Sequence, residues 1–168
     1  MPDQLCVSNN TYLLTRQGTV YLNLLTDAYS HRIIGAYAHA SMHTDGCRAA
    51  LPASATFGLV YHSDWGTQYY SDAYQSQLSP AGLVCSMTEG PGDCSQNALA
   101  ERVNGILKEE FLFLLPTDVA EARLLVAQAV QRYNHERPYL SLNYLTSQQA
   151  KSPAGKSERG PCLFPVSM

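Results

Sequence analysis

Three β-favouring segments joined by short turns open the sequence, and this feature constrains the fold more than any other. Residues 12–14 and 20–25 flank TRQG, which predicts a hairpin that turns at Gly18. Residues 32–37 follow the polar turn DAYSH and predict a third strand. Sequential strands with short connections form an antiparallel meander.

Helical and strand patterns alternate after the meander. Residues 44–53 are alanine-rich and helical in pattern, and residues 57–61 form a continuous apolar run that predicts a strand buried on both faces. Residues 71–78 predict a short helix, and residues 83–87 predict another strand. The pattern therefore indicates an α/β fold in which alternating strands and helices follow the meander.

Two longer helices close the ordered part of the sequence. The first covers residues 97–115 up to Pro116, and Leu99, Val103 and Leu107 give it an apolar face. The second begins with Thr117 or Asp118 as its cap and stops before Pro138. We expect a domain over residues 1–149 and a loose extension over residues 150–168, which are rich in Pro, Gly and Ser.

Composition excludes several classes of protein. The chain has 168 residues, of which 45% are hydrophobic and 15% charged, as in a globular domain rather than a disordered chain. No signal peptide or membrane-length apolar run is present, which indicates a cytoplasmic protein without a membrane partner. Five scattered cysteines contain no Cys-x-x-Cys pair, and the net charge of −3 disfavours binding to nucleic acid by phosphate neutralisation alone.

Two carboxylates stand where a metal site could form. Asp64 comes directly after the apolar run 57–61 and its polar exit, and Glu101 lies one turn into the predicted helix that begins at residue 97. Carboxylates from a strand end and a nearby helix could share a divalent cation such as Mg²⁺. The alternative is that Asp64 is only a turn or cap residue.

A polar stripe follows the same helix. Asn97, Glu101, Asn104 and Lys108 recur at helical spacing, opposite the apolar face. Such a stripe is most often the solvated side of a helix, and spacing alone does not exclude that interpretation.

Four sequence motifs occur together in a recognisable order: HSDWGTQYYSDAYQSQL, CSMTEG, QNALAERVNGILKEEF and RYNHERPYLSLNYLT. Their order and separation resemble the integrase-core catalytic domain of bacterial insertion-sequence transposases, whose enzyme is commonly a fusion of a helix-turn-helix frame with a catalytic frame. The resemblance runs from about Cys6 to Gln149.

The resemblance implies a ribonuclease-H-like fold and a polynucleotidyl transferase of the DDE type. In that family three carboxylates hold two Mg²⁺ or Mn²⁺ ions, which activate the attacking hydroxyl and stabilise displacement at phosphorus. The second carboxylate matches Asp64 and the third matches Glu101. The first should stand at Asn9, so this chain carries an amide where the family has an aspartate.

The amide at Asn9 implies weak metal binding and impaired catalysis. An amide offers one neutral oxygen and cannot bridge two cations as a carboxylate can. If Asn9 lay opposite Leu25, Asp27 would be a diagonal neighbour on the same face and could replace the missing carboxylate. A turn role for Asp27 in DAYS is the favoured interpretation.

The resemblance also implies contacts with DNA. The residues expected to make them are Trp65, Gln68, Asn97, Arg102, Asn104 and Lys108. Within RYNHERPY, Tyr133, Asn134, Arg137 and Pro138 are expected to be structural instead, tying the last helix to the body of the domain.

Three functional hypotheses remain at this stage. The first is a transposase catalytic core, impaired at Asn9, that cuts and joins insertion-sequence ends and target DNA in the nucleoid, as a homo-oligomer or with a full-length transposase. The second is an inactive remnant that at most binds DNA or a transposase, and it is favoured for present activity. The third is a metal-dependent nuclease of the same fold, which the motifs beyond Asp64 and Glu101 do not favour.

Overall fold

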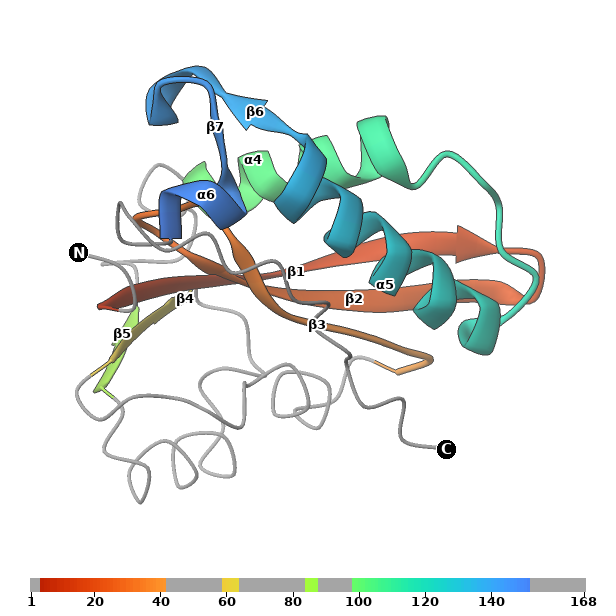
Figure 1. Cartoon of the computed structure of the whole chain (residues 1–168). Coiled ribbons are helices and arrows are strands. Elements are labelled where there is room, and N and C mark those ends of the chain that lie inside the picture. The colour runs from red at the N-terminus through yellow and green to blue at the C-terminus, as the bar shows by residue number, and fades with distance from the viewer. Residues whose placement is uncertain (1–3, 42–58, 64–83, 88–97, 152–168) are drawn as a thin grey trace.

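The computed structural model describes residues 4–41, 59–63, 84–87 and 98–151 of the chain (Figure 1). Its first three strands, β1 (Leu5–Thr15), β2 (Gly18–Asp27) and β3 (Ile33–His39), form the expected antiparallel meander. Thr15 pairs with Gly18, and the positive φ of Gly18 (126°) closes the turn. The predicted helices over residues 44–53 and 71–78 lie outside the described residues.

The sheet continues on the other side of β1 with two parallel strands. β4 (Val60–Ser63) pairs with β1, and β5 (Val84–Met87) pairs with β4. The strand order is β3-β2-β1-β4-β5, which makes β1 the central strand. The backbone of β1 pairs with β2 over Cys6–Thr15 and also with β4 over Leu5–Ser8, which holds this end of the strand rigidly.

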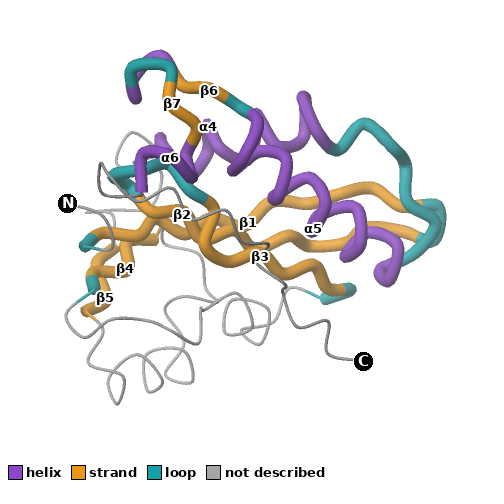
Figure 2. The backbone as a smooth tube through the Cα atoms, viewed as in Figure 1, coloured by secondary structure: helices purple, strands orange, loops and turns teal. Residues whose placement is uncertain are grey.

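The described helices all lie on one side of this sheet (Figures 1 and 2). They are α4 (Ala98–Ile106), which continues into the π-helical turn η2 (Leu107–Phe111), α5 (Val119–Glu136) and the short α6 (Ser147–Lys151). A small ribbon of β6 (Pro138–Tyr139) and β7 (Leu145–Thr146), joined through the 3₁₀ turn η3 (Leu140–Leu142), connects α5 to α6. Among the described helices, none is both long and apolar enough to cross a membrane.

Helix α5 begins and ends at the residues its sequence specifies. Asp118 is the N-cap, and its carboxylate accepts a hydrogen bond of 2.9 Å from the backbone N–H of Glu121. The Glu121 carboxylate in turn accepts from the N–H of Thr117, so two otherwise unpaired donors are satisfied at the helix start. The helix ends at Glu136, before Pro138.

The helix predicted over residues 97–115 is too long at its C-terminal end. The N–H of Leu112 donates to the carbonyl of Leu107 at 3.0 Å, which closes a π turn, and no helix continues from there to the start of α5. The N–H of Arg16 donates to the carbonyl of Pro116 at 2.9 Å and holds this connection against the hairpin turn. As a result Phe113, Leu114 and Leu115 are exposed rather than part of a helix face.

The hydrophobic core lies between the sheet and the helices. Alternate residues of β2 point toward α4 and α5, as the two-residue period of a strand requires. Leu22 is fully buried there, which contributes about 1.5–3 kcal/mol relative to an exposed side chain. The other buried members of the cluster are Val20, Leu24, Ile33, Ala38, Val103, Leu107, Ala122, Val126, Ala129, Val130, Tyr133 and Tyr139.

Residues of the RYNHERPY motif tie α5 to its neighbours. The hydroxyl of Tyr133 donates to the carbonyl of His31 at 3.0 Å. The guanidinium of Arg137 donates to both carboxylate oxygens of Glu110, at 2.7 and 2.8 Å, and lies over the ring of Tyr139. These contacts confirm the structural role expected for Tyr133 and Arg137.

Candidate active site

Asn9 lies on the helix-facing side of the central strand. Its register partner on β2 is Leu24, which belongs to the core beneath the helices. Directly opposed residues of paired strands share a face of the sheet, so Asn9 points toward the same side as α4. Only 8% of Asn9 is exposed.

Glu101 reaches the same place from α4. It stands in the first turn of that helix, and α4 packs against β1. A pocket of about 300 Å³ opens between the two elements. Its lining contains Asn9, Asn10, Thr11, Glu101, Asn104, Gly105, Lys108 and Glu109. Two of the three positions that sequence analysis assigned to the metal site therefore line one pocket.

Strand β4, which leads to Asp64, the remaining position of the expected metal site, lies next to β1. Ser63, the last residue of β4, is the register partner of Ser8, which directly precedes Asn9. Asp64 follows Ser63 in the chain but lies outside the described residues, as do Trp65, Gln68 and Asn97.

The side chains at the end of β4 are polar, with Ser63 buried and His62 partly buried. The Nδ1 atom of His62 is 3.1 Å from the Oγ atom of Ser86 on β5. The Nε2 atom of His62 and the Oγ atom of Ser63 have no hydrogen-bond partner among the described residues. Sequence analysis singled out neither side chain, because only burial distinguishes them from ordinary strand residues.

Asn104 departs from the expectation of a solvated helix stripe. Only 5% of it is exposed, and it lines the pocket one helical turn after Glu101. Its Oδ1 atom is buried and has no hydrogen-bond partner among the described residues. An unpaired buried amide oxygen costs about 1–3 kcal/mol, which is unusual without a functional reason.

Lys108 and Arg102, both expected to contact DNA, occupy different surroundings. The ammonium of Lys108 donates to Oγ1 of Thr11 at 3.3 Å and lies 4.8 Å from the centre of the Tyr12 ring, at the pocket wall. Arg102 is exposed and is not part of the pocket lining. Its positive charge instead acts on His31, whose pKa is lowered first by burial and then by Arg102.

The hypothesis that Asp27 replaces the missing carboxylate is wrong. Asp27 pairs with Cys6, and Asn9 pairs with Leu24 rather than Leu25. Cys6 and Asn9 are three residues apart on one strand, so they lie on opposite faces of the sheet. Asp27 is fully buried and accepts hydrogen bonds from the backbone N–H of Ser30 at 2.9 Å and from its hydroxyl at 2.5 Å. It is a turn residue, as the favoured interpretation held.

The pocket offers oxygen donors of the kind that Mg²⁺ and Mn²⁺ prefer. Glu101 supplies a carboxylate, and Asn9 and Asn104 supply amide oxygens. Within the described part of the chain, no three His, Cys, Asp or Glu side chains gather as a metal site. This donor set fits a single weakly held cation better than two, because the lining contains two carboxylates, Glu101 and Glu109, and the Lys108 ammonium offsets one of their negative charges.

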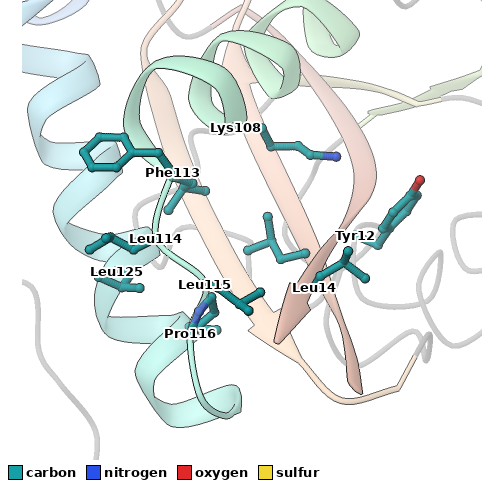
Figure 3. Close-up of a pocket in the computed structure, with 11 residues that line it drawn as sticks. Tyr12, Leu14, Lys108, Phe113, Leu114, Leu115, Pro116 and Leu125 are labelled. Carbon is teal, nitrogen blue, oxygen red and sulfur yellow. The ribbon is translucent and has the colours of Figure 1, made fainter. Parts of the chain in front are cut away.

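Two other hollows are apolar and unsuited to cations. The first, of about 300 Å³, lies where the connection after η2 faces β1, and Figure 3 shows Leu114 and Leu115 across from Tyr12 and Leu14. The second, of about 450 Å³, lies between β3 and α5 and has Ile34 and Leu124 in its lining. Neither contains Asn9 or Glu101.

The chain matches known proteins over most of its length. The family model of the integrase core domain matches residues 82–146. The transposase for insertion sequence element IS629 of Shigella sonnei is 39% identical over 141 residues, which cover 81% of this chain and 47% of the relative. A putative transposase for IS986/IS6110 of Mycobacterium tuberculosis (strain ATCC 25177 / H37Ra) is 32% identical over 152 residues, 82% of this chain and 54% of the relative.

The chain belongs to the integrase core domain family of insertion-sequence transposases. This integrase core domain spans about half the length of the curated relatives it matches.

Solved structures bear out the fold of this integrase core domain. The magnesium complex of the HTLV-2 integrase catalytic core domain, in its trimeric form, has a TM-score of 0.70 at 18% identity and covers 89% of this chain and 97% of that one. The simian T-cell lymphotropic virus intasome has a TM-score of 0.77 at 20% identity, covering all of this chain and 60% of that one. The ribonuclease-H-like fold is therefore confirmed.

Proposed function

We propose that this chain is the catalytic domain of a DDE transposase whose metal site is impaired by Asn9. The observation that carries the proposal is the pocket between β1 and α4, which brings the Asn9 position and Glu101 together. Asp64 is the expected second carboxylate, and β4 leads toward it beside β1. The matched relatives are named as insertion-sequence transposases, which supports DNA as the substrate.

Asp64 and Glu101 would hold Mg²⁺ or Mn²⁺ in this proposal. The bound ion would activate the attacking hydroxyl and stabilise the charge that develops at phosphorus. The ammonium of Lys108, at the pocket wall, is available to neutralise a phosphate of the bound strand. Asn104 would then face the reacting end of the strand from inside the pocket, while Arg102 would contact the DNA backbone farther away.

Asn9 sets the limit on activity. An aspartate at this position would add one negative charge and a second oxygen able to bridge cations. With an amide there, the site holds less negative charge than two divalent ions require, so we expect weak metal binding and little strand transfer. In that case the domain acts at most as a DNA-binding or transposase-binding module, in a homo-oligomer or with a full-length transposase.

The test is a calorimetric Mn²⁺ titration of the chain and of three variants. We expect Asn9→Asp to bind Mn²⁺ at least about tenfold more tightly than the parent chain, because a bridging carboxylate is restored. Glu101→Gln in the Asn9→Asp background should remove this gain. Glu136→Gln, which changes an exposed carboxylate on α5 that is not part of the pocket lining, is the matched control and should leave most of the gain.

The outcomes separate the alternatives. A gain in Asn9→Asp that disappears with Glu101→Gln supports an intact site that lacks one ligand. Equal, weak binding in the parent and Asn9→Asp would overturn the proposed site and leave an inactive folded domain. Efficient Mn²⁺-dependent joining of DNA ends by the parent chain would overturn the proposed impairment.

A further inference from the structure

Asn104 carries a buried amide oxygen that nothing in the fold explains. Its neighbours Val103 on α4 and Leu107 on η2 enter the core, so the helix rotation holds Asn104 at the edge between core and pocket. The residue is nine-tenths buried, and Oδ1 has no partner among the described residues. By contrast, both amide atoms of Asn134, the other buried asparagine on these helices, are hydrogen-bonded.

The other groups in the pocket do not supply the missing donor. The ammonium of Lys108 donates to Thr11 instead, and the side chain of Glu101 offers only acceptors when ionised. An acceptor in such a place is satisfied by a group that brings positive charge or hydrogen-bond donors into the pocket. A hydrated divalent cation brings both, because Mg²⁺ and Mn²⁺ retain several of their water molecules when protein carboxylates bind them.

We propose that Asn104 is a positioning residue of the metal site, and that its Oδ1 atom accepts a hydrogen bond from the hydration shell of the cation held by Glu101. This inference rests on the proposed function. It assigns Asn104 a role toward the metal that is separate from any contact with DNA. Supporting groups of this kind commonly change metal affinity by 10–100-fold when they are removed.

The proposal predicts that removing the Asn104 amide preserves or raises the metal-free Tm but lowers the Mn²⁺ affinity. Asn104→Leu replaces the amide by an apolar side chain of similar size, so the unpaired polar atom disappears from the metal-free protein. We expect its metal-free Tm to equal or exceed that of the parent. Its Mn²⁺ affinity should fall about tenfold, because the acceptor for the hydration shell is lost. A purely structural asparagine would lower Tm and leave the affinity unchanged.

The experiment combines Mn²⁺ calorimetry with thermal unfolding in the full chain carrying Asn9→Asp, where binding is strong enough to measure. Asn104→Asp is the second variant, and its carboxylate should tighten Mn²⁺ binding while lowering the metal-free Tm through repulsion with Glu101. Mn²⁺ should then raise the Tm of Asn104→Asp more than that of its parent. This arm keeps the proposal testable even where Asn104→Leu does not fold.

Each result has one meaning when Glu101→Gln is measured beside the two variants. Weaker binding in Asn104→Leu together with tighter binding in Asn104→Asp supports the proposal. Unchanged affinity in both, with weaker binding in Glu101→Gln, overturns the role of Asn104 and leaves the proposed function standing. Unchanged affinity in Glu101→Gln overturns the proposed function itself.

Discussion

Asn134 and Ile33 form a closed pair of hydrogen bonds between helix α5 and strand β3. The amide Nδ2 of Asn134 donates to the carbonyl of Ile33, and its Oδ1 accepts from the N–H of the same residue, both at 2.9 Å. The Asn134 side chain thus pairs with the backbone N–H and carbonyl of Ile33, the first residue of β3, as a neighbouring strand would. It fixes α5 on strand β3, against which the helix packs.

Asn134→Leu should lower the free energy of unfolding by about 2–4 kcal/mol, because it leaves a buried backbone donor and acceptor of Ile33 unpaired. Urea unfolding followed by circular dichroism measures this. Gln131→Ala, an exposed position on the same helix, is the control and should stay within about 0.5 kcal/mol of the parent. An equally small effect of Asn134→Leu would mean that the pair does not hold α5 to the sheet.

Glu110 and Arg137 should give a pH-dependent contribution to stability. The double hydrogen bond from Arg137 holds the pKa of Glu110 below its ordinary value of 4.5. A carboxyl with a lowered pKa stabilises the fold above the ordinary value, and this stability is lost as the pH falls through the lower, folded value. The side chain of Glu110 is 44% exposed, so solvent screening limits the contribution to about 0.5–1 kcal/mol.

The check is the difference in unfolding free energy between the parent chain and Glu110→Gln. It should be present at pH 7 and vanish in strong acid. Arg137→Lys keeps the charge but loses the planar fork, so it should retain only part of the difference. A difference that is the same at both pH values would mean that the ion pair is not its source.

His31 should make the domain less stable in mild acid. Burial, and next the charge of Arg102, lower the pKa of His31, while Asp27 raises it to a smaller degree. The unfolded chain therefore takes up the proton more readily than the folded one. Stability should fall as the pH decreases below the ordinary value of 6.5 and stop falling below the lowered, folded value.

His31→Asn tests this dependence. Asparagine tolerates the positive φ of 58° at this position, so the backbone strain is not increased. The slope of unfolding free energy between pH 7.5 and pH 5 should be smaller in His31→Asn than in the parent, with the remaining histidines common to both. An unchanged slope would assign the acid sensitivity to other groups.

We expect Phe113 to contribute to the exposed apolar surface and not to the stability of the fold. It is 71% exposed on the connection after η2, next to the exposed Leu114 and Leu115 (Figure 3). Phe113→Ser should change the unfolding free energy by no more than about 0.5 kcal/mol while reducing the binding of an apolar dye. Leu107→Ala, at a fully buried position a few residues earlier, should cost about 2–5 kcal/mol. Comparable costs for the two variants would contradict the π turn that separates them.

The local sequence pattern correctly predicted the elements whose conformation is determined by their own residues. Helix α5 follows from its apolar spacing, the cap at Asp118 and the stop before Pro138. The meander follows from its short turns. The register considered from the sequence, with Asn9 opposite Leu25, was one residue out, because the turn occupies Arg16 and Gln17 between Thr15 and Gly18. A shift of one residue moves every side chain to the other face, and that is why Asp27 was assigned to the wrong side of the sheet.

Features that depend on distant contacts could not be predicted. The early end of the helix containing Glu101 depends on a π turn and on a hydrogen bond from Arg16, neither of which has a local signal. Asn9 and Glu101, which resemblance and spacing assigned to one site, line one pocket, and their role in metal binding stays a prediction. The burial of Asn104 was missed, because a helix stripe of polar residues gives no information about the strand that covers it.

The domain boundary at residue 149 stays a prediction, although α6 continues to Lys151.

The buried apolar cluster under the helices draws on β2, β3, α4, η2, α5 and β6, and within the described residues it includes no buried member from β1, β4 or β5. Amide protons of β2, β3 and α5 should therefore exchange with solvent only on global unfolding, while those of β4 exchange through local openings that cost less free energy. Glu101 stands on α4, which contributes to the cluster, and Asn9 stands on β1 and pairs there with the cluster residue Leu24, whereas β4 pairs with β1 and β5. A cation bound between them would join two cooperative units, and its clearest signature would be slower exchange along β4.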